Sequence, residues 1–301
     1  MPAAAQPTTD ELQFDDAFLR KLERLAVVAK RVAARHGRGE RRTRHVGSGI
    51  EFADHRDYVP GDDLRHLDWN LYGRLERPLV RLFDEDEDLP VYVICDTSAS
   101  MGLGQPPKLA LARAVAAALA YVALTNLDRV AVYAATDGLG GGLGLVRGKA
   151  QIHPLLELLS GLQPAGRTNL GAAVSGLVQR HRRRGLVVVI SDFYDPVGFE
   201  RGLDRLRYGR FEPVIVQITA PDEAAPPLRG ELTVIDVETG EERPVTVTPA
   251  VAAGYRQRYE ARLRGLSRFC RERAIPCFQV TSSHPLEDLV LRVLRTGELL
   301  K

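Results

Sequence analysis

The sequence predicts an α/β fold with a doubly wound, mostly parallel sheet, an N-terminal helical extension and a β-hairpin insertion. From residue 89 onward, short runs rich in Val and Ile alternate with longer segments of helical periodicity. The runs are apolar at nearly every position, which is typical of strands covered on both faces, and the intervening helices imply parallel crossovers. The expected strands are residues 89–96, 129–136, 185–192, 212–219 and 276–281.

Helical patterns follow or separate these strands, and Pro or Thr lies near the start of several of them. The segment DGLGGGLGLVRG at residues 137–148 instead predicts a turn leading into a short edge strand. A dinucleotide-binding glycine loop must lie between a strand and a helix, and no helix follows here. The expected helices are residues 106–125, 152–162, 168–182, 196–208, 250–274 and 286–296.

The N-terminal part begins with an amphipathic helix at residues 14–36, where apolar residues recur every three or four positions. We expect this helix to pack on the main domain. Residues 35–49 are basic and contain glycine, so we interpret them as an exposed linker, with contact to an acidic partner or a nucleic acid as the alternative. The apolar positions of the helix are Phe14, Phe18, Leu22, Leu25 and Val28.

We divide the chain into three parts. Residues 1–44 hold the N-terminal helix and basic linker, residues 45–88 form a segment dense in opposite charges, and residues 89–298 form the α/β domain. Within that domain, residues 228–249 carry two strand patterns on either side of Glu238-Thr239-Gly240, which predicts the β-hairpin. No motif in the hairpin indicates its role.

The composition excludes several classes of function. The 301 residues include 41 Lys and Arg against 39 Asp and Glu, and this near balance gives no general reason to expect nucleic-acid binding. Three cysteines, Cys95, Cys270 and Cys277, form no C-x-x-C pair, which argues against a disulfide framework or a zinc knuckle. No apolar run approaches the roughly 18 to 20 residues of a membrane span. We therefore expect a cytoplasmic protein with no membrane span.

The first candidate site lies at the end of the first buried strand, at Asp96-Thr97-Ser98-Ala99-Ser100. Ligands bind at the carboxyl ends of strands in open α/β sheets. Alternate residues of an extended segment point the same way, so Asp96, Ser98 and Ser100 can present three oxygen groups to one point. Such hard ligands suit Mg²⁺, Mn²⁺ or Ca²⁺. The alternative is that a serine caps the following helix.

Two more oxygen groups are expected at the same edge of the sheet. Thr168 begins a predicted helix, and Asp192 ends the strand GLVVVIS. Each residue has a structural alternative, because Thr is a common N-cap and Asp a common turn or cap residue.

The pattern Asp96-x-Ser98-x-Ser100, Thr168 and Asp192 resembles the metal-ion-dependent adhesion site of von Willebrand factor A domains. All five positions are filled in the same order, each beside a predicted strand end. The resemblance implies a Mg²⁺-type ion held directly by Ser98, Ser100 and Thr168, with Asp96 and Asp192 close by and partly acting through water. It also implies an open coordination position that accepts a carboxylate from a partner protein, and therefore recognition without catalysis.

The segment before the first buried strand is similar to a narrower group, the bacterial and archaeal domain-of-unknown-function family numbered 58. Its members resemble von Willebrand factor A proteins and commonly accompany MoxR-type AAA+ ATPases, which implies an adaptor or co-chaperone role with such an ATPase as partner. A structural ion-pair network, with Asp62 or Asp63 capping a helix, is the alternative for these residues. The matching positions are Gly49, Phe52, Arg56, Tyr58, Pro60, Gly61, Asp62, Asp63, Arg65, Asp68, Trp69 and Arg74.

An enzymatic alternative is a haloacid-dehalogenase-like phosphatase that uses Mg²⁺ and has Asp96 as nucleophile. Ser98 departs from that pattern, since those enzymes have an acidic residue there, and no lysine near Thr168 matches their phosphate-stabilising group. Serine hydrolysis is weaker still, because no G-x-S-x-G elbow occurs. The basic run His181 to Arg184 lies at a predicted helix C-terminus, where positive charge is stabilising, so it does not require a nucleic acid.

Overall fold

The computed structural model describes residues 14–36, 42–46, 51–86 and 90–296. The described residues divide into two compact units, one holding residues 14–30 and 90–296 and the other holding those between residues 31 and 86. Each unit is described by itself below.

The larger unit is built on a six-stranded sheet in the order β11-β8-β7-β4-β5-β6. The first five of these strands are parallel to their neighbours, and β6 pairs antiparallel with β5 at the edge. The prediction of a doubly wound, mostly parallel sheet is therefore confirmed. The strands are β4 (Val91–Asp96), β5 (Arg129–Ala135), β6 (Leu139–Arg147), β7 (Leu186–Ser191), β8 (Glu212–Thr219) and β11 (Cys277–Thr281).

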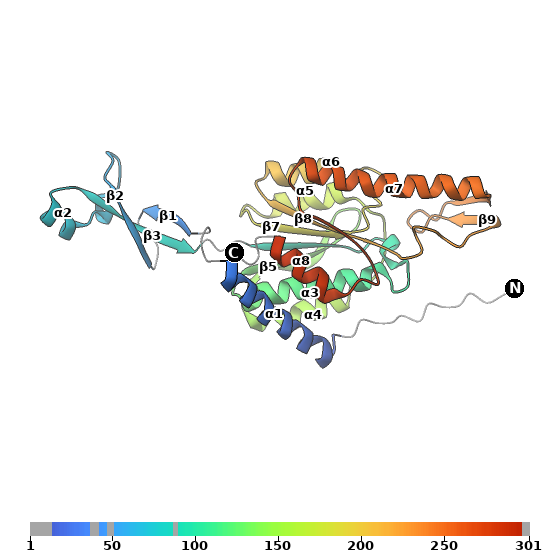
Figure 1. Cartoon of the computed structure of the whole chain (residues 1–301), viewed down its shortest axis with the longest axis horizontal. Helices are drawn as coiled ribbons and strands as arrows, with labels where there is room; N and C mark the ends of the chain where they lie inside the picture. The colour runs from blue at the N-terminus through green and yellow to red at the C-terminus, as the bar shows by residue number, and fades with distance from the viewer. Residues whose placement is uncertain (1–13, 37–41, 47–50, 87–89, 297–301) are drawn as a thin grey trace. The chain divides into compact units, whose positions relative to one another are not determined.

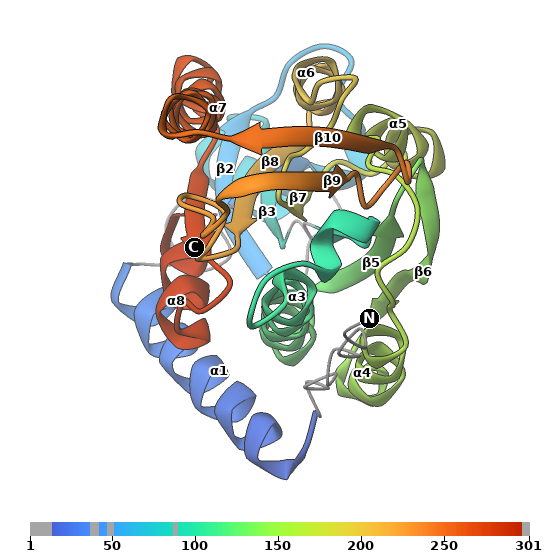
Figure 2. The same cartoon turned by 90° about the vertical axis from the view of Figure 1, so that its right-hand side faces the viewer.

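Helices cover both faces of this sheet (Figures 1 and 2). One face carries α1, α3, α4 and α8, and the other carries α5, α6 and α7. The strands β4 and β7 are buried at every position because they lie in the middle of this sandwich. The helices are α1 (Asp16–His36), α3 (Lys108–Thr125), α4 (Ile152–Ser160), α5 (Leu170–Arg180), α6 (Glu200–Tyr208), α7 (Pro249–Glu272) and α8 (Leu286–Thr296).

The N-terminal helix α1 packs on the larger unit as predicted. Phe18, Leu22 and Leu25 are buried, which accounts for the apolar spacing seen in the sequence. An ion pair of 3.0 Å between Lys21 Nζ and Glu287 Oε1 joins α1 to α8.

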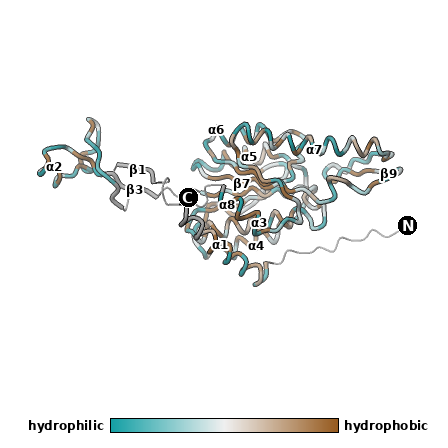
Figure 3. Tube along the Cα trace, in the orientation of Figure 1, coloured by the Kyte–Doolittle hydropathy of each residue, from teal (hydrophilic) through white to brown (hydrophobic). Residues whose placement is uncertain are grey.

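The helix α3 is apolar on nearly all sides and lies inside the fold. Its 18 residues are long and apolar enough to cross a membrane by composition, yet 89% of that window is buried within the protein. The expectation that no apolar run reaches this length was wrong for α3, whose composition suits a core helix. Figure 3 shows the hydrophobic colour concentrated in the central strands and hydrophilic residues recurring along α6 and α7.

The predicted insertion is a two-stranded hairpin, β9 (Gly230–Ile235) and β10 (Glu242–Val247), paired antiparallel. Most of its residues are exposed. Figure 2 shows it crossing in front of the ends of the central strands, between α7 and α5.

The smaller unit contains a three-stranded antiparallel sheet in the order β1-β3-β2, which the sequence did not predict. The interpretation of residues 35–49 as a linker was wrong for Arg42–Val46, which form β1. The sequence RTRHV holds one apolar residue, so the alternation that identifies a strand is missing. The remaining elements are β2 (Glu51–Asp57), η1 (Leu64–His66), α2 (Trp69–Leu75) and β3 (Leu79–Asp86).

Candidate functional site

Asp96 is the last residue of β4 and is only 1% exposed. Its Oδ1 accepts a 2.8 Å hydrogen bond from the Ser98 backbone N–H, and its Oδ2 accepts a 2.5 Å bond from the Ser191 hydroxyl. Burial and the nearby charge of Asp192 raise the pKa of Asp96 to about 7, against the effect of these hydrogen bonds. The two neighbouring buried carboxylates therefore repel each other, and positive charge beside them is stabilising.

Ser98 and Ser100 turn their hydroxyl groups toward each other beside Asp96. Both residues are buried, and their hydroxyl groups are hydrogen-bonded to each other, with the two Oγ atoms 3.1 Å apart. The helix α3 begins only at Lys108, and Ser98 makes no capping hydrogen bond to the short 3₁₀ turn η2 (Ala99–Gly102). The interpretation of these serines as helix caps was therefore wrong.

The donor set of this loop fits a small hard cation. Adjacent ligands of a six-coordinate magnesium ion, each about 2.1 Å from the metal, lie about 3.0 Å apart. The Ser98 and Ser100 hydroxyl oxygens are hydrogen-bonded to each other at 3.1 Å, so a cation that replaced this bond would find them close to the required spacing. Among the described residues there is no group of three or more His, Cys, Asp or Glu able to hold a metal, so a candidate cation site here depends on hydroxyl oxygens.

Thr168 lies just before α5, in a loop hydrogen-bonded to the Asp96 loop. The Ala165 N–H donates to the Thr97 carbonyl at 2.8 Å, and the Ala99 N–H donates to the Gly166 carbonyl at 3.1 Å. The sequence placed the helix start at Thr168, but α5 begins at Leu170. Thr168 is buried and does not cap the helix.

The capping role at α5 belongs to Asn169. Its side-chain Oδ1 accepts a 2.9 Å hydrogen bond from the Ala172 N–H, as an N-cap does. The Thr168 hydroxyl is thereby left for another partner.

Asp192 follows β7 and is fully buried. Its Oδ1 accepts a hydrogen bond of 2.9 Å from the Tyr194 N–H. Asp192 therefore does stabilise the turn after β7, as its structural alternative predicted. Its Oδ2 accepts one of 2.7 Å from the Lys108 ammonium, which also donates to Glu223 Oε1 at 2.6 Å. Because the buried Lys108 ammonium already neutralises Asp192 and would repel a cation placed against it, Asp192 is better suited to act on a cation through water or charge than as a direct ligand.

Lys108 is a buried cation that sequence reasoning missed. It is 1% exposed, and although burial lowers its pKa, the charges of Asp192 and Glu223 outweigh that effect and raise it above the usual value. A lysine at the start of an Ala-rich helix is normally a surface residue. No feature of the sequence indicates that Lys108 is buried.

Glu238 is a second residue that the sequence did not connect with the site. It lies between β9 and β10, and its carboxylate accepts two hydrogen bonds from Thr168. The Thr168 hydroxyl donates to Oε1 at 2.7 Å and its backbone N–H donates to Oε2 at 3.1 Å. A separation of 70 residues leaves no local pattern that could have revealed the contact.

The family-pattern residues of the smaller unit form ion pairs, as the structural alternative proposed. Asp68 Oδ2 accepts a hydrogen bond from Arg81 Nε at 2.9 Å and is 3.1 Å from His55 Nε2, while its Oδ1 caps α2. Of the two expected caps, Asp63 caps η1 and pairs with Arg65.

The remaining family-pattern residues of the smaller unit differ in their contacts, backbone conformation and exposure. Asp62 accepts hydrogen bonds from Arg56 Nη2 and the Val59 N–H, both at 2.9 Å. Gly61 has a φ of +110°, a conformation that favours glycine. Trp69 is 61% exposed, and Arg74 is also exposed, whereas Tyr58 is partly buried. Gly49 and Phe52 lie outside the residues whose side chains are described.

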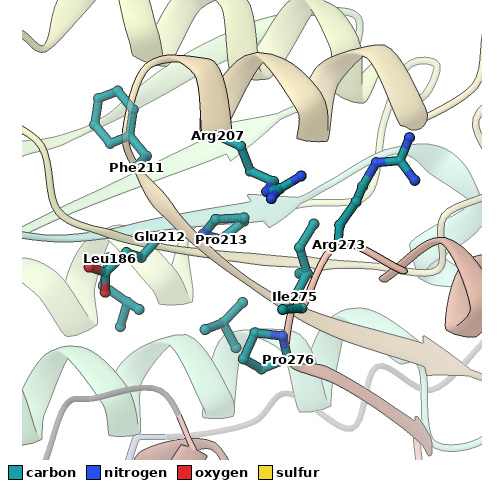
Figure 4. Close-up of a pocket in the computed structure, with 10 residues that line it drawn as sticks. Leu186, Arg207, Phe211, Glu212, Pro213, Arg273, Ile275 and Pro276 are labelled. Carbon is teal, nitrogen blue, oxygen red and sulfur yellow. The ribbon is translucent and has the colours of Figure 1, made fainter. Parts of the chain in front are cut away.

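A hollow of about 430 Å³ lies at the opposite edge of the sheet, where β7 and β8 begin (Figure 4). Leu186, Phe211, Pro213 and Ile275 contribute apolar surface, and Arg207 and Arg273 approach it (Figure 4). Arg273 is paired with Asp204 at 2.7 Å. None of the predicted site residues lines this hollow.

Comparison with known proteins identifies the family. The family model described as "Protein of unknown function DUF58" matches residues 54–265. The chain belongs to the DUF58 family. Uncharacterized proteins of Mycobacterium bovis and Mycobacterium tuberculosis are each 30% identical to this DUF58 protein over 250 residues, covering 81% of this chain and 78% of theirs.

Solved structures similar to this DUF58 protein include two from Bacteroides. BatB of Bacteroides thetaiotaomicron has a TM-score of 0.46 and 13% identity, covering 70% of this chain and 98% of that one. An aerotolerance-related membrane protein of Bacteroides fragilis has a TM-score of 0.45 and 14% identity, covering 70% and 99%. The mostly parallel six-stranded sheet between two helical layers agrees with the expected von Willebrand factor A-like architecture.

Proposed function

We propose that this protein is a metal-dependent protein-binding module. In this proposal Ser98, Ser100 and Thr168 hold a Mg²⁺ ion, with Mn²⁺ or Ca²⁺ as alternatives, while Asp96 and Asp192 supply negative charge beside it. The observation that carries the proposal is the pair of buried serine hydroxyls 3.1 Å apart, next to a buried carboxylate and free of any capping role. When bound, the ion would supply an electrophilic position for a carboxylate of the partner.

The protein's own residues hold this geometry in place. The Ser191 hydroxyl and the backbone N–H of Ser98 each donate to one oxygen of Asp96, so both of its oxygens are fixed. Lys108 fixes one oxygen of Asp192 and balances part of its charge. With few carboxylates free to bind it directly, a divalent ion keeps residual positive charge, which favours an acidic ligand.

The partner class follows from the family resemblance. A MoxR-type AAA+ ATPase that presents an acidic residue is the proposed partner, and the protein would act in the cytoplasm as its adaptor or co-chaperone during assembly or maturation of protein complexes. The exposed side chains of Trp69 and Tyr72 on α2 offer a second contact surface on the smaller unit.

The phosphatase alternative is disfavoured by the surroundings of Asp96. A nucleophilic carboxylate needs an oxygen exposed to the substrate. Both oxygens of Asp96 accept hydrogen bonds from the protein, and the residue is 1% exposed. We therefore assign no catalytic residue.

A pull-down with a purified MoxR-type AAA+ ATPase from the same organism tests this proposal. We expect capture by the wild-type protein in Mg²⁺, and loss of capture with a chelator or with Ser98→Ala. The matched control is Ser283→Ala, which changes an exposed serine beyond β11 and should leave capture intact. Equal capture by wild type and Ser98→Ala, with and without the chelator, would place the interaction on another surface.

A further inference from the structure

The tip of the β9–β10 hairpin places the Glu238 carboxylate against Thr168, one of the residues proposed to hold the cation. Glu238 holds Thr168 through two hydrogen bonds, one from the hydroxyl at 2.7 Å and one from the backbone N–H at 3.1 Å. Thr168 is 2% exposed, and Glu238 is partly buried although its neighbours Val237 and Thr239 are exposed. The contact is therefore a specific insertion of one side chain.

A well-ordered turn directs Glu238 toward the site. Asp236 Oδ1 accepts hydrogen bonds from the N–H groups of Glu238 and Thr239, at 2.8 and 3.1 Å. The Asp236 carbonyl accepts a 2.8 Å bond from the Gly240 N–H, and Gly240 has a φ of +72°, which glycine adopts without strain. These bonds lie within the turn itself, so the turn keeps its shape independently of the core.

The strands of the hairpin contribute little to the core. Most residues of β9 and β10 are exposed, and an isolated two-stranded hairpin is marginally stable in water. Figure 2 shows the hairpin crossing the carboxyl ends of the central strands without joining their sheet. Its tip can therefore leave the site without breaking the packing of the larger unit.

We propose that Glu238 is an internal ligand of the cation site, occupying the position that an acidic partner would otherwise take. The inference rests on the proposed function, because it concerns the same cation. A carboxylate is acceptor-only and is a hard oxygen ligand of the type that Mg²⁺ and Mn²⁺ prefer. It is also the chemical group expected from the partner, so the two compete for one position, and binding requires the hairpin tip to move aside.

The test compares Glu238→Gln with wild type, using Mn²⁺ alone as the probe of the full chain. Gln keeps the size of the side chain and removes its charge. Glu242→Gln is the matched control, since Glu242 is an exposed carboxylate on the same hairpin. Electron paramagnetic resonance gives the affinity for Mn²⁺, and water-proton relaxation reports how many exchangeable water molecules the bound ion carries.

We expect Glu238→Gln to weaken Mn²⁺ binding by at least roughly tenfold, since tenfold is the lower end of the loss for residues that only orient a metal ligand. We also expect greater water-proton relaxation per bound ion, because the neutral Gln amide oxygen is a weaker ligand than a carboxylate and water takes its place. Acetate, as a probe of an external carboxylate, should then lower that relaxation at a smaller concentration than it does in wild type. Glu242→Gln should behave as wild type in all three measurements.

Two results overturn the inference in distinguishable ways. If wild type binds Mn²⁺ and Ser98→Ala does not, but Glu238→Gln shows unchanged relaxation per bound ion, Glu238 is not a ligand and the proposed function stands. If wild type and Ser98→Ala bind Mn²⁺ equally weakly, the cation site itself is wrong and both proposals fall.

Discussion

The Ser191 hydroxyl donates a 2.5 Å hydrogen bond to Asp96 Oδ2 and so joins the ends of the neighbouring strands β7 and β4. The same hydroxyl oxygen accepts a 2.8 Å bond from the Phe193 N–H. One small side chain therefore satisfies two buried polar groups and fixes the orientation of the central carboxylate. Together with the hydrogen bond from the Ser98 N–H, the bond from Ser191 holds the Asp96 carboxylate against the loop that carries Ser98.

Replacing Ser191 by Ala is expected to destabilise the fold. The change leaves a buried carboxylate oxygen and a buried N–H without their partner, at a cost of about 1–3 kcal/mol in the free energy of unfolding. Denaturant unfolding measures this cost. Ser283→Ala, at an exposed serine, should change stability by no more than about 0.5 kcal/mol. Equal effects of the two changes would contradict the bridging role of Ser191.

Lys108→Met is expected to be more severe, because it removes the cation that is 2.7 Å from Asp192 Oδ2. Loss of one partner from a buried ion pair costs about 3–5 kcal/mol, since the remaining charge is left uncompensated. Thermal or denaturant unfolding checks the value. Lys149→Met serves as the control at an exposed lysine. A Lys108→Met protein as stable as this control would show that the pair contributes no net stability.

Acid should weaken the smaller unit through Asp68. The Arg81 side chain, the Leu71 N–H and His55 hold the pKa of Asp68 well below its usual range. A carboxyl whose pKa is lower in the folded state contributes stability above its unfolded pKa of about 3.9, and that contribution is lost as the pH falls toward the folded value. Asp68→Asn should therefore make stability less dependent on pH between about pH 5 and pH 3.

Trp69 offers a local readout of this effect, because it is the single tryptophan of the chain and follows Asp68 at the start of α2. Its fluorescence during denaturant titrations at each pH reports the unfolding of the smaller unit. An unchanged pH dependence in Asp68→Asn would assign the acid sensitivity to other carboxylates.

The α/β core was predictable because its physical signals are local and strong. Strands such as Leu186–Ser191 are apolar at nearly every position, and crossover helices separate them, so the sheet class follows from the pattern. The smaller sheet was missed because the charged sequence of Arg42–Val46 has neither apolar continuity nor alternation.

The candidate site was predictable only in part. The spacing of Asp96, Ser98 and Ser100 is local, and the structure places these residues together. Lys108 and Glu238 could not be found, since their contacts with Asp192 and Thr168 span 84 and 70 residues. Such contacts depend on how α3 and the hairpin are positioned in three dimensions, which no short motif encodes.

A divalent ion bound at Asp96, Ser98 and Ser100 should stabilise the folded protein, and thermal unfolding measures that stabilisation. At a hundredfold excess over its dissociation constant, an ion that binds only the folded state adds about 2.7 kcal/mol. For a domain of this size the melting temperature rises by about 2–4 °C per kcal/mol. Because Asp192 repels Asp96 when no ion is present, removal of one carboxylate can stabilise the metal-free form, and only the Mg²⁺-dependent difference is diagnostic.

We therefore compare wild type, Ser98→Ala and Asp96→Ala, each melted with Mg²⁺ and with a chelator. We expect the melting temperature of wild type to rise by several degrees with Mg²⁺ and that of either variant to stay unchanged. If wild type melts at the same temperature with Mg²⁺ and with the chelator, no divalent ion binds at Asp96, Ser98 and Ser100.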